Sequence, residues 1–100
     1  MKPEQLERIF RVNMRKRRLE LELTQEQVAE RSGISQPHIS ALERGTMAPT
    51  IPSIAKVAEA LRCPPSALLS AETAEMMAAI FLARAGQLYA AKSDREPDRS

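Results

Sequence analysis

The chain has 100 residues, a formal net charge of +2 and a single cysteine. This length accommodates one domain with one core. A composition of 43% apolar and 28% charged residues is that of a folded chain rather than a disordered one. One cysteine and one histidine exclude an intramolecular disulfide and a metal site built from those ligands. Because aromatics make up only 3%, the core must consist of aliphatic side chains, which favours an all-α fold over a sheet.

The first predicted helix runs from Pro3 to about Leu21, because proline is tolerated in the first turn of a helix. Its inward stripe is predicted from side chains spaced three to four residues apart. The stripe consists of Leu6, Phe10, Met14, Arg18 and Leu21. Arg18 is a charged residue among apolar ones, so it requires a partner.

Two short helices joined by a tight turn are predicted over residues 24–45. Thr24 is expected to cap the first helix, with Gln27 as its reciprocal partner in a capping box. Gly33 supplies the positive φ that a sharp turn needs, and Ser35 caps the second helix. This order of caps and turn residues predicts a rigid two-helix elbow.

The second helix of this pair is predicted to present polar side chains. The residues expected to face inward, spaced by one helical repeat, are Val28, Ala29, Ile39 and Leu42. The residues expected to face outward are Gln36, His38, Ser40, Ala41 and Arg44. A short polar-faced helix on a rigid elbow fits the major groove of DNA. The pattern therefore predicts a DNA-reading helix-turn-helix motif over residues 24–44.

The charged residues near this motif have two interpretations. Six basic residues and no acid lie between Arg8 and Arg18. A charge run alone is usually a solvated helix face, but beside this motif Arg15, Lys16 and Arg17 are placed to approach phosphates. His38 is likewise either a solvated side chain or a contact to a base or phosphate.

A loop follows the motif and leads to a fourth helical segment. Thr50 is expected to cap this helix, with Pro52 in its first turn, and the helix extends to about Arg62. Its core positions are Ile54, Val57, Ala58 and Leu61. Cys63 is predicted to pack as a small hydrophobe, in preference to acting as a reactive thiol. A short fifth helix or turn is predicted over residues 66–70.

A further helix is predicted from Ser70 to about Lys92, with Ser70 as its cap. Its middle, MMAAIFLA, is apolar on almost every side, which is more than a terminal helix of a small domain can bury. Exposed apolar surface usually marks a partner site. The interface residues expected in a homodimer are Met76, Met77, Ile80, Phe81 and Leu88. The alternative is that the helix adds to the core. The run is too short for a membrane span, and residues 93–100 are expected to be disordered.

Residues 15–69 resemble the phage-repressor and Cro-type helix-turn-helix family, also called the xenobiotic-response-element type. The resemblance is carried by the segments LELELTQ, QEQVAERSGISQPHISALERG and APTIPSIAKVAEALRCPPSALL. The positions whose spacing matches the family are Gln25, Ala29, Gly33, Ile39 and Leu42. The resemblance implies a compact five-helix DNA-binding bundle over residues 1–69, to which residues 70–92 add a C-terminal helix for dimerisation.

The resemblance also implies roles for individual residues. Gln36 stands where the family reads a base edge, and a glutamine amide matches adenine. Gln25 is expected to touch a phosphate and to brace Gln36, and Arg18 and Glu43 fall on the family's structural ion pair. The other expected base contacts are Pro37, His38, Ser40 and Ala41. The other expected phosphate contacts are Ser35, Arg44, Thr46, Arg15 and Arg17. No operator sequence is predicted, because the expected base contacts other than Gln36 have weak base preferences.

These features predict a sequence-specific transcription regulator, a repressor or controller protein of prokaryotic or phage type, that binds double-stranded DNA. One recognition helix buries too little surface for tight specific binding, so a homodimer on a palindromic operator is expected. The plan is similar to that of restriction–modification controller proteins and phage immunity repressors. The alternative is a protein-interaction module, such as the antitoxin of a toxin pair, whose C-terminal helix binds another chain.

An enzyme is not expected, because the chain lacks a phosphate-binding glycine loop and a histidine set beside an acid and a nucleophile. No metal, cofactor, small-molecule ligand or membrane partner is expected either. A cytoplasmic location is expected, because no signal peptide or membrane-length apolar segment is recognisable.

Overall fold

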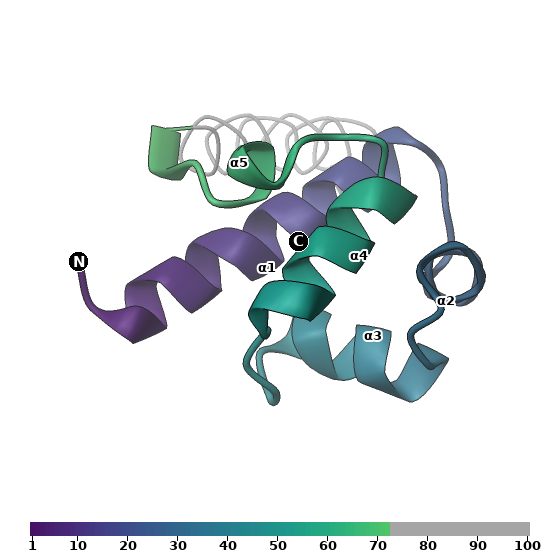
Figure 1. The fold of residues 1–100 in the computed structure, drawn as a ribbon, viewed down its shortest axis with the longest axis horizontal. Coiled ribbons are helices and arrows are strands. Elements are labelled where there is room, and N and C mark those ends of the chain that lie inside the picture. The colour runs from purple at the N-terminus through teal and green to yellow at the C-terminus, as the bar shows by residue number, and fades with distance from the viewer. Residues whose placement is uncertain (73–100) are drawn as a thin grey trace, which may run out of the picture.

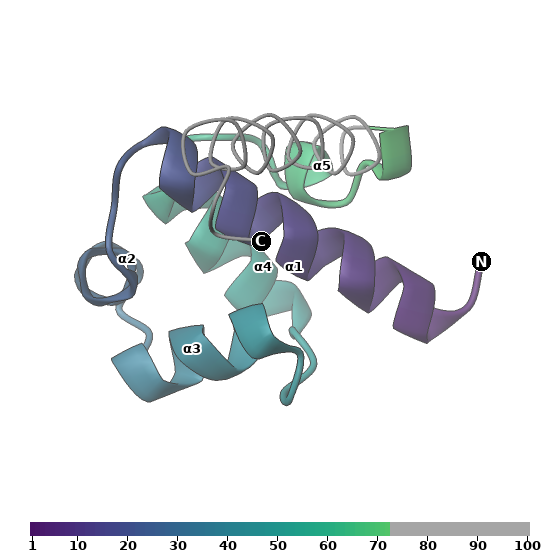
Figure 2. The same ribbon diagram turned by 180° about the vertical axis from the view of Figure 1, so that it is seen from behind.

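The computed structural model describes residues 1–72. These residues form the helices α1 (Pro3–Glu20), α2 (Gln25–Ser32), α3 (Gln36–Arg44), α4 (Ile51–Ala60) and α5 (Pro65–Leu68). Helix α1 runs through the middle of the bundle, with α3 on one side and α5 on the opposite side (Figures 1 and 2). Over this part of the chain there is no strand, so the predicted all-α fold is confirmed. No helix in it is long and apolar enough to cross a membrane.

The predicted dimer helix and tail fall largely beyond this range. Residues 73–92 of the expected helix lie outside the described residues, as does the expected disordered tail over residues 93–100. The same holds for the expected interface residues Met76, Met77, Ile80, Phe81 and Leu88. Their role stays a prediction.

The helix ends follow the local chemistry of the sequence. The Thr24 hydroxyl accepts a hydrogen bond from the Gln27 backbone N–H at 3.1 Å, and the Gln27 side chain accepts from the Thr24 N–H at 2.8 Å. Gly33 has φ 76°, the left-handed conformation that a residue without Cβ adopts readily. The Ser35 hydroxyl accepts from the backbone of α3, and Thr50 caps α4 in the same way. The predicted elbow is therefore confirmed.

The core is assembled from all five helices. Its largest fully buried side chains are Phe10, Met14, Ile39, Leu42, Leu61, Leu68, Val28 and Val57. Each contributes about 1.5–3 kcal/mol when removed from water. Helix α3 is held by Ile39 and Leu42, which leaves its opposite side free to carry function.

One member of the predicted inward stripe is placed differently. Leu6 is 40% exposed, whereas Phe10 and Met14, further along the same face, are fully buried. The N-terminal turns of α1 extend past α3 and α4 (Figure 1), and Leu6 belongs to this N-terminal part of the helix. Helical periodicity predicts which residues share a face, but not how far along the helix its neighbours extend.

Candidate nucleic-acid interface

Helix α3 lies at the edge of the bundle (Figure 1). Its exposed and half-buried side chains are mostly polar. Gln36, Pro37 and Arg44 are exposed, while His38 and Ser40 are half-buried. Ser35 caps the helix through a bond from His38 N–H to its hydroxyl at 3.3 Å. Pro37 stands in the first turn, where a backbone N–H has no intrahelical partner to lose. These placements agree with the outward face expected from the sequence.

Ala41 is the exception on this face. It was expected to point outward and to touch bases, but the structure buries it to 8% exposure. An alanine side chain reaches only one carbon from the backbone, so neighbouring groups cover it. Its carbonyl group accepts hydrogen bonds from the N–H groups of Gly45 and Thr46, which folds the following loop back onto the end of α3. We therefore omit Ala41 from the base contacts proposed below.

Arg18 and Glu43 form a bidentate ion pair between α1 and α3. Arg18 Nε donates to Glu43 Oε2 at 2.6 Å, and Arg18 Nη2 donates to Glu43 Oε1 at 3.0 Å. Arg18 Nη1 donates to the Leu23 carbonyl oxygen at 2.8 Å. The side chains are 12% and 2% exposed, so each charge depends on the other for compensation. This pairing explains the charge within the inward stripe of α1.

The ion pair continues into a chain of hydrogen bonds that reaches the surface. Gln25 Nε2 donates to Glu43 Oε1 at 3.2 Å. Gln36 Nε2 in turn donates to Gln25 Oε1 at 3.3 Å. The first residues of α2 and α3 are thus braced against each other, as the resemblance implied, and both are linked to the buried carboxylate.

The expected phosphate contacts around α3 differ in how freely they can donate. Arg44 is exposed and bonds to the Ser40 hydroxyl one turn earlier. Thr46 is exposed, and its hydroxyl donates to the Ala41 carbonyl at 3.4 Å. Arg15 is exposed on α1, and no hydrogen bond or ion pair ties it to another residue in the 1–72 range. Within residues 1–72, Arg15 is therefore an exposed cation of the basic run without a bonded partner.

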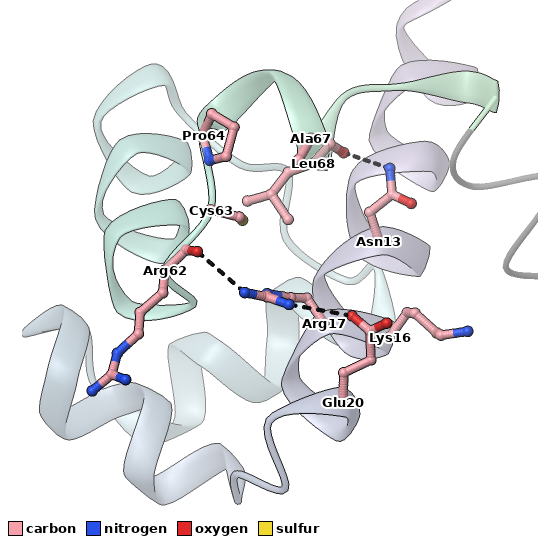
Figure 3. A pocket seen from close by; sticks show the side chains of 9 residues that line it. All are labelled: Asn13, Lys16, Arg17, Glu20, Arg62, Cys63, Pro64, Ala67 and Leu68. Atoms are coloured by element: carbon pink, nitrogen blue, oxygen red, sulfur yellow. Dashed lines mark hydrogen bonds and ion pairs between the residues drawn. The ribbon is translucent and has the colours of Figure 1, made fainter.

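Arg17, predicted as a phosphate contact, is bonded to the end of α4 and to a neighbouring carboxylate on α1. Its Nε donates to the Leu61 carbonyl at 2.9 Å and its Nη2 to the Arg62 carbonyl at 3.2 Å. Its Nη1 also lies 3.6 Å from Glu20 Oε1 (Figure 3). These bonds place the guanidinium at the C-terminal end of α4, where unpaired carbonyl groups favour a cation. The side chain joins α1 to α4, so we propose packing as its role in place of phosphate binding.

A basic residue that the sequence reasoning did not single out lies close to α3. A Cβ atom at Gly45 would come within 2.8 Å of Arg11 Nη1, so the Arg11 side chain lies across the C-terminal cap of the helix. Gly45 has φ 80°, and glycine suits both this conformation and this close approach. Arg11 precedes Arg18 by two helical turns and shares its face of α1. That spacing is the signal that could have identified it.

Comparison with known proteins agrees with this geometry. The model of a helix-turn-helix family matches residues 14–68, more than half of the chain. The chain belongs to the helix-turn-helix family of the Cro and C1 type.

Two curated relatives come from Sinorhizobium fredii strain NGR234. The uncharacterized HTH-type transcriptional regulator y4dJ is 47% identical over 49 residues, which cover 49% of this chain and 64% of that protein. The uncharacterized HTH-type transcriptional regulator y4dL is 49% identical over 39 residues, which cover 39% of this chain and 20% of that protein. The chain thus matches less than two thirds of either relative.

Proposed function

We propose that the protein is a DNA-binding regulator of transcription, without enzymatic activity, whose helix α3 enters the major groove. The observation that carries this proposal is the exposed Gln36 at the start of α3, held by Gln25 from α2. Membership of the helix-turn-helix family and the regulator names of both relatives support it. A DNA partner also fits the expected cytoplasmic location.

The proposed base contacts are the exposed and half-exposed side chains of α3. They are Gln36, Pro37, His38 and Ser40. After donating one N–H to Gln25, the Gln36 amide keeps one N–H and its oxygen for a base. Adenine presents the matching pair in the major groove, an acceptor at N7 and a donor at N6. An A·T pair opposite Gln36 is therefore the proposed preference.

The proposed phosphate contacts surround this face. They are Gln25, Ser35, Arg44, Thr46 and Arg15, with Arg11 added from the structure. Phosphate contacts position the protein on the duplex and provide most of its salt-dependent affinity.

The protein is further proposed to act as a homodimer on a palindromic operator, as a repressor or controller protein. A single recognition helix contacts too few base pairs for high affinity, and a two-fold symmetric dimer doubles that contact. Occupancy of the operator would then depend on protein concentration through dimerisation.

Selection of binding sites from random duplex DNA, at low and at high salt, tests this function. A two-fold symmetric site that is retained at high salt is the expected result, and it also provides the half-site spacing. Absence of any enriched sequence, with binding that fades as salt rises, would refute a sequence-specific regulator and favour a protein-interaction module.

Gln36→Ala should relax the preference at one base pair of each half-site and cost about 1–3 kcal/mol of binding free energy. Equilibrium binding to the selected site and its single-base variants measures both effects. A profile identical to that of the parent protein would rule out Gln36 as a base contact.

A further inference from the structure

The hydrogen bonds from Arg18 to Gln36 connect a buried carboxylate with an exposed amide at the proposed DNA surface. Glu43 is 7% exposed and Gln25 is half-buried, while Gln36 is exposed. The two amide links measure 3.2 and 3.3 Å between donor and acceptor. In each of these hydrogen bonds, the chemistry of the two groups fixes which one donates and which one accepts.

The direction follows from what each group can donate. A glutamine amide has a donating nitrogen and an accepting oxygen, so it can take two orientations that fill the same space. A carboxylate paired with arginine only accepts. Gln25 must therefore turn its nitrogen to Glu43 and its oxygen to Gln36. Gln36 must then donate to Gln25, which fixes its own amide orientation.

The orientation of the Gln36 amide decides which purine it matches. With one N–H given to Gln25, Gln36 offers a base one donor and one acceptor, which fits adenine. If Gln25 were reversed, the Gln36 oxygen would accept from it and both N–H groups would face the base. Two donors fit guanine, whose major-groove edge carries the acceptors N7 and O6.

We propose that Glu43, held by Arg18, is a specificity-determining residue that makes Gln36 select adenine over guanine by fixing the direction of the Gln25 and Gln36 amides. Glu43 and Gln25 act here as positioning residues and do not touch the base. The inference rests on the proposed function, in which Gln36 reads a base edge.

We call the hydrogen bonds from Glu43 through Gln25 to Gln36 the relay. Gln25→Met tests it, because this substitution removes the amide while keeping the side-chain length and leaving the Arg18–Glu43 pair intact. Binding to duplexes that differ only at the base pair read by Gln36 is compared with that of the parent protein. A bidentate contact discriminates between bases by roughly 5- to 150-fold. In Gln25→Met we expect the ratio of adenine to guanine affinities to fall at least severalfold, while both purines stay preferred over pyrimidines.

Gln27→Met is the matched control. It makes the same substitution on α2 and removes the capping bond to Thr24, but it leaves the relay untouched. Its adenine-to-guanine ratio should equal that of the parent protein. If Gln25→Met weakens binding to all four duplexes equally, Gln25 serves only as a phosphate contact and the relay is refuted.

A second variant addresses Glu43 itself. The double substitution Arg18→Met with Glu43→Gln removes both charges together, so neither is left buried alone. The new amide at position 43 can face Gln25 with either group, so the adenine-to-guanine ratio should fall as in Gln25→Met. Thermal unfolding checks that the variant is folded under the binding conditions. An unchanged ratio in this folded variant overturns the role of Glu43.

The base profile of Gln36→Ala distinguishes failure of the relay from failure of the proposed base contact of Gln36. If Gln36→Ala alters the base profile and Gln25→Met does not, only the relay fails. If Gln36→Ala leaves the profile unchanged, the proposed base contact fails and the relay with it.

Discussion

The Arg18–Glu43 ion pair that joins α3 to α1 is also expected to contribute strongly to the stability of the fold. The Glu43 side chain is almost fully buried, and two hydrogen bonds link it to the largely buried Arg18. Removing one partner leaves an uncompensated charge in the core, whereas replacing both with apolar groups removes the charge and the desolvation cost together.

Glu43→Ala should therefore lower the free energy of unfolding by about 3–5 kcal/mol, a large part of the stability of a small domain. The double variant Arg18→Met with Glu43→Leu should lose clearly less. Urea denaturation of the three proteins measures both values. Equal losses in the single and the double variant would show that packing, rather than the unpaired charge, determines the effect.

Cys63 is partly buried, and this position is expected to lower the reactivity of its thiol. It packs against the core, and this burial raises the pKa of the thiol, an effect that Arg17 opposes and Glu20 reinforces. The thiolate is the reactive form, so a raised pKa leaves less of it near neutral pH. The prediction that Cys63 packs as a small hydrophobe agrees with this position.

At pH 8, Cys63 should thus react with iodoacetamide more slowly than a free peptide thiol does. The rate should increase as pH rises through the raised pKa, and urea should bring it to the peptide value at pH 8. Mass spectrometry of timed samples measures the alkylated fraction. Modification of the folded protein as fast as the peptide would contradict a raised pKa of this partly buried thiol.

At the scale of helices, local sequence patterns predicted the contacts between near neighbours. Distant contacts were predicted only where the family resemblance implied them, as for Arg18 and Glu43. Thr24, Gly33 and Ser35 act on backbone groups within four residues, so their roles could be inferred from local patterns. Arg17 reaches carbonyl groups 44 and 45 residues away, which no local pattern contains. Ala41 was misplaced for a related reason, because its burial depends on surrounding groups rather than on helical periodicity.

Arg15 and Arg17 should consequently have separable effects. Arg17→Gln removes the bonds from α1 to the end of α4 and should lower the free energy of unfolding by about 1–2 kcal/mol. The salt dependence of its DNA binding should match that of the parent protein. Thermal unfolding and binding at several salt concentrations provide the two measurements.

Arg15→Gln is the matched variant, since Arg15 is exposed and makes none of these bonds. It should keep the parent stability while the slope of log affinity against log salt falls by about one for the lost phosphate contact. An unchanged slope would identify Arg15 as a solvated side chain. A reduced slope in Arg17→Gln would contradict the assignment of Arg17 to packing.

At the scale of the whole molecule, the described bundle offers one recognition helix, while the proposed palindromic operator needs two. The second copy is expected to associate through the apolar segment MMAAIFLA, predicted from the sequence as a dimer helix. Dimerisation and DNA binding are then linked by mass action, because a symmetric site binds the dimer more tightly than two separate monomers.

Phe81→Asp places a charge within this segment and should shift the protein toward monomer, since an unpaired carboxylate is costly to bury in an interface. Sedimentation equilibrium measures the monomer–dimer constant, and binding is compared on a full palindrome and on a single half-site. The affinity for the palindrome should fall while that for the half-site stays the same. Ser93→Asp adds the same charge outside the apolar segment and should change neither quantity. If Phe81→Asp leaves self-association unchanged, the dimer forms through another surface; if the parent protein is monomeric on a fully occupied palindrome, the proposed homodimer is wrong.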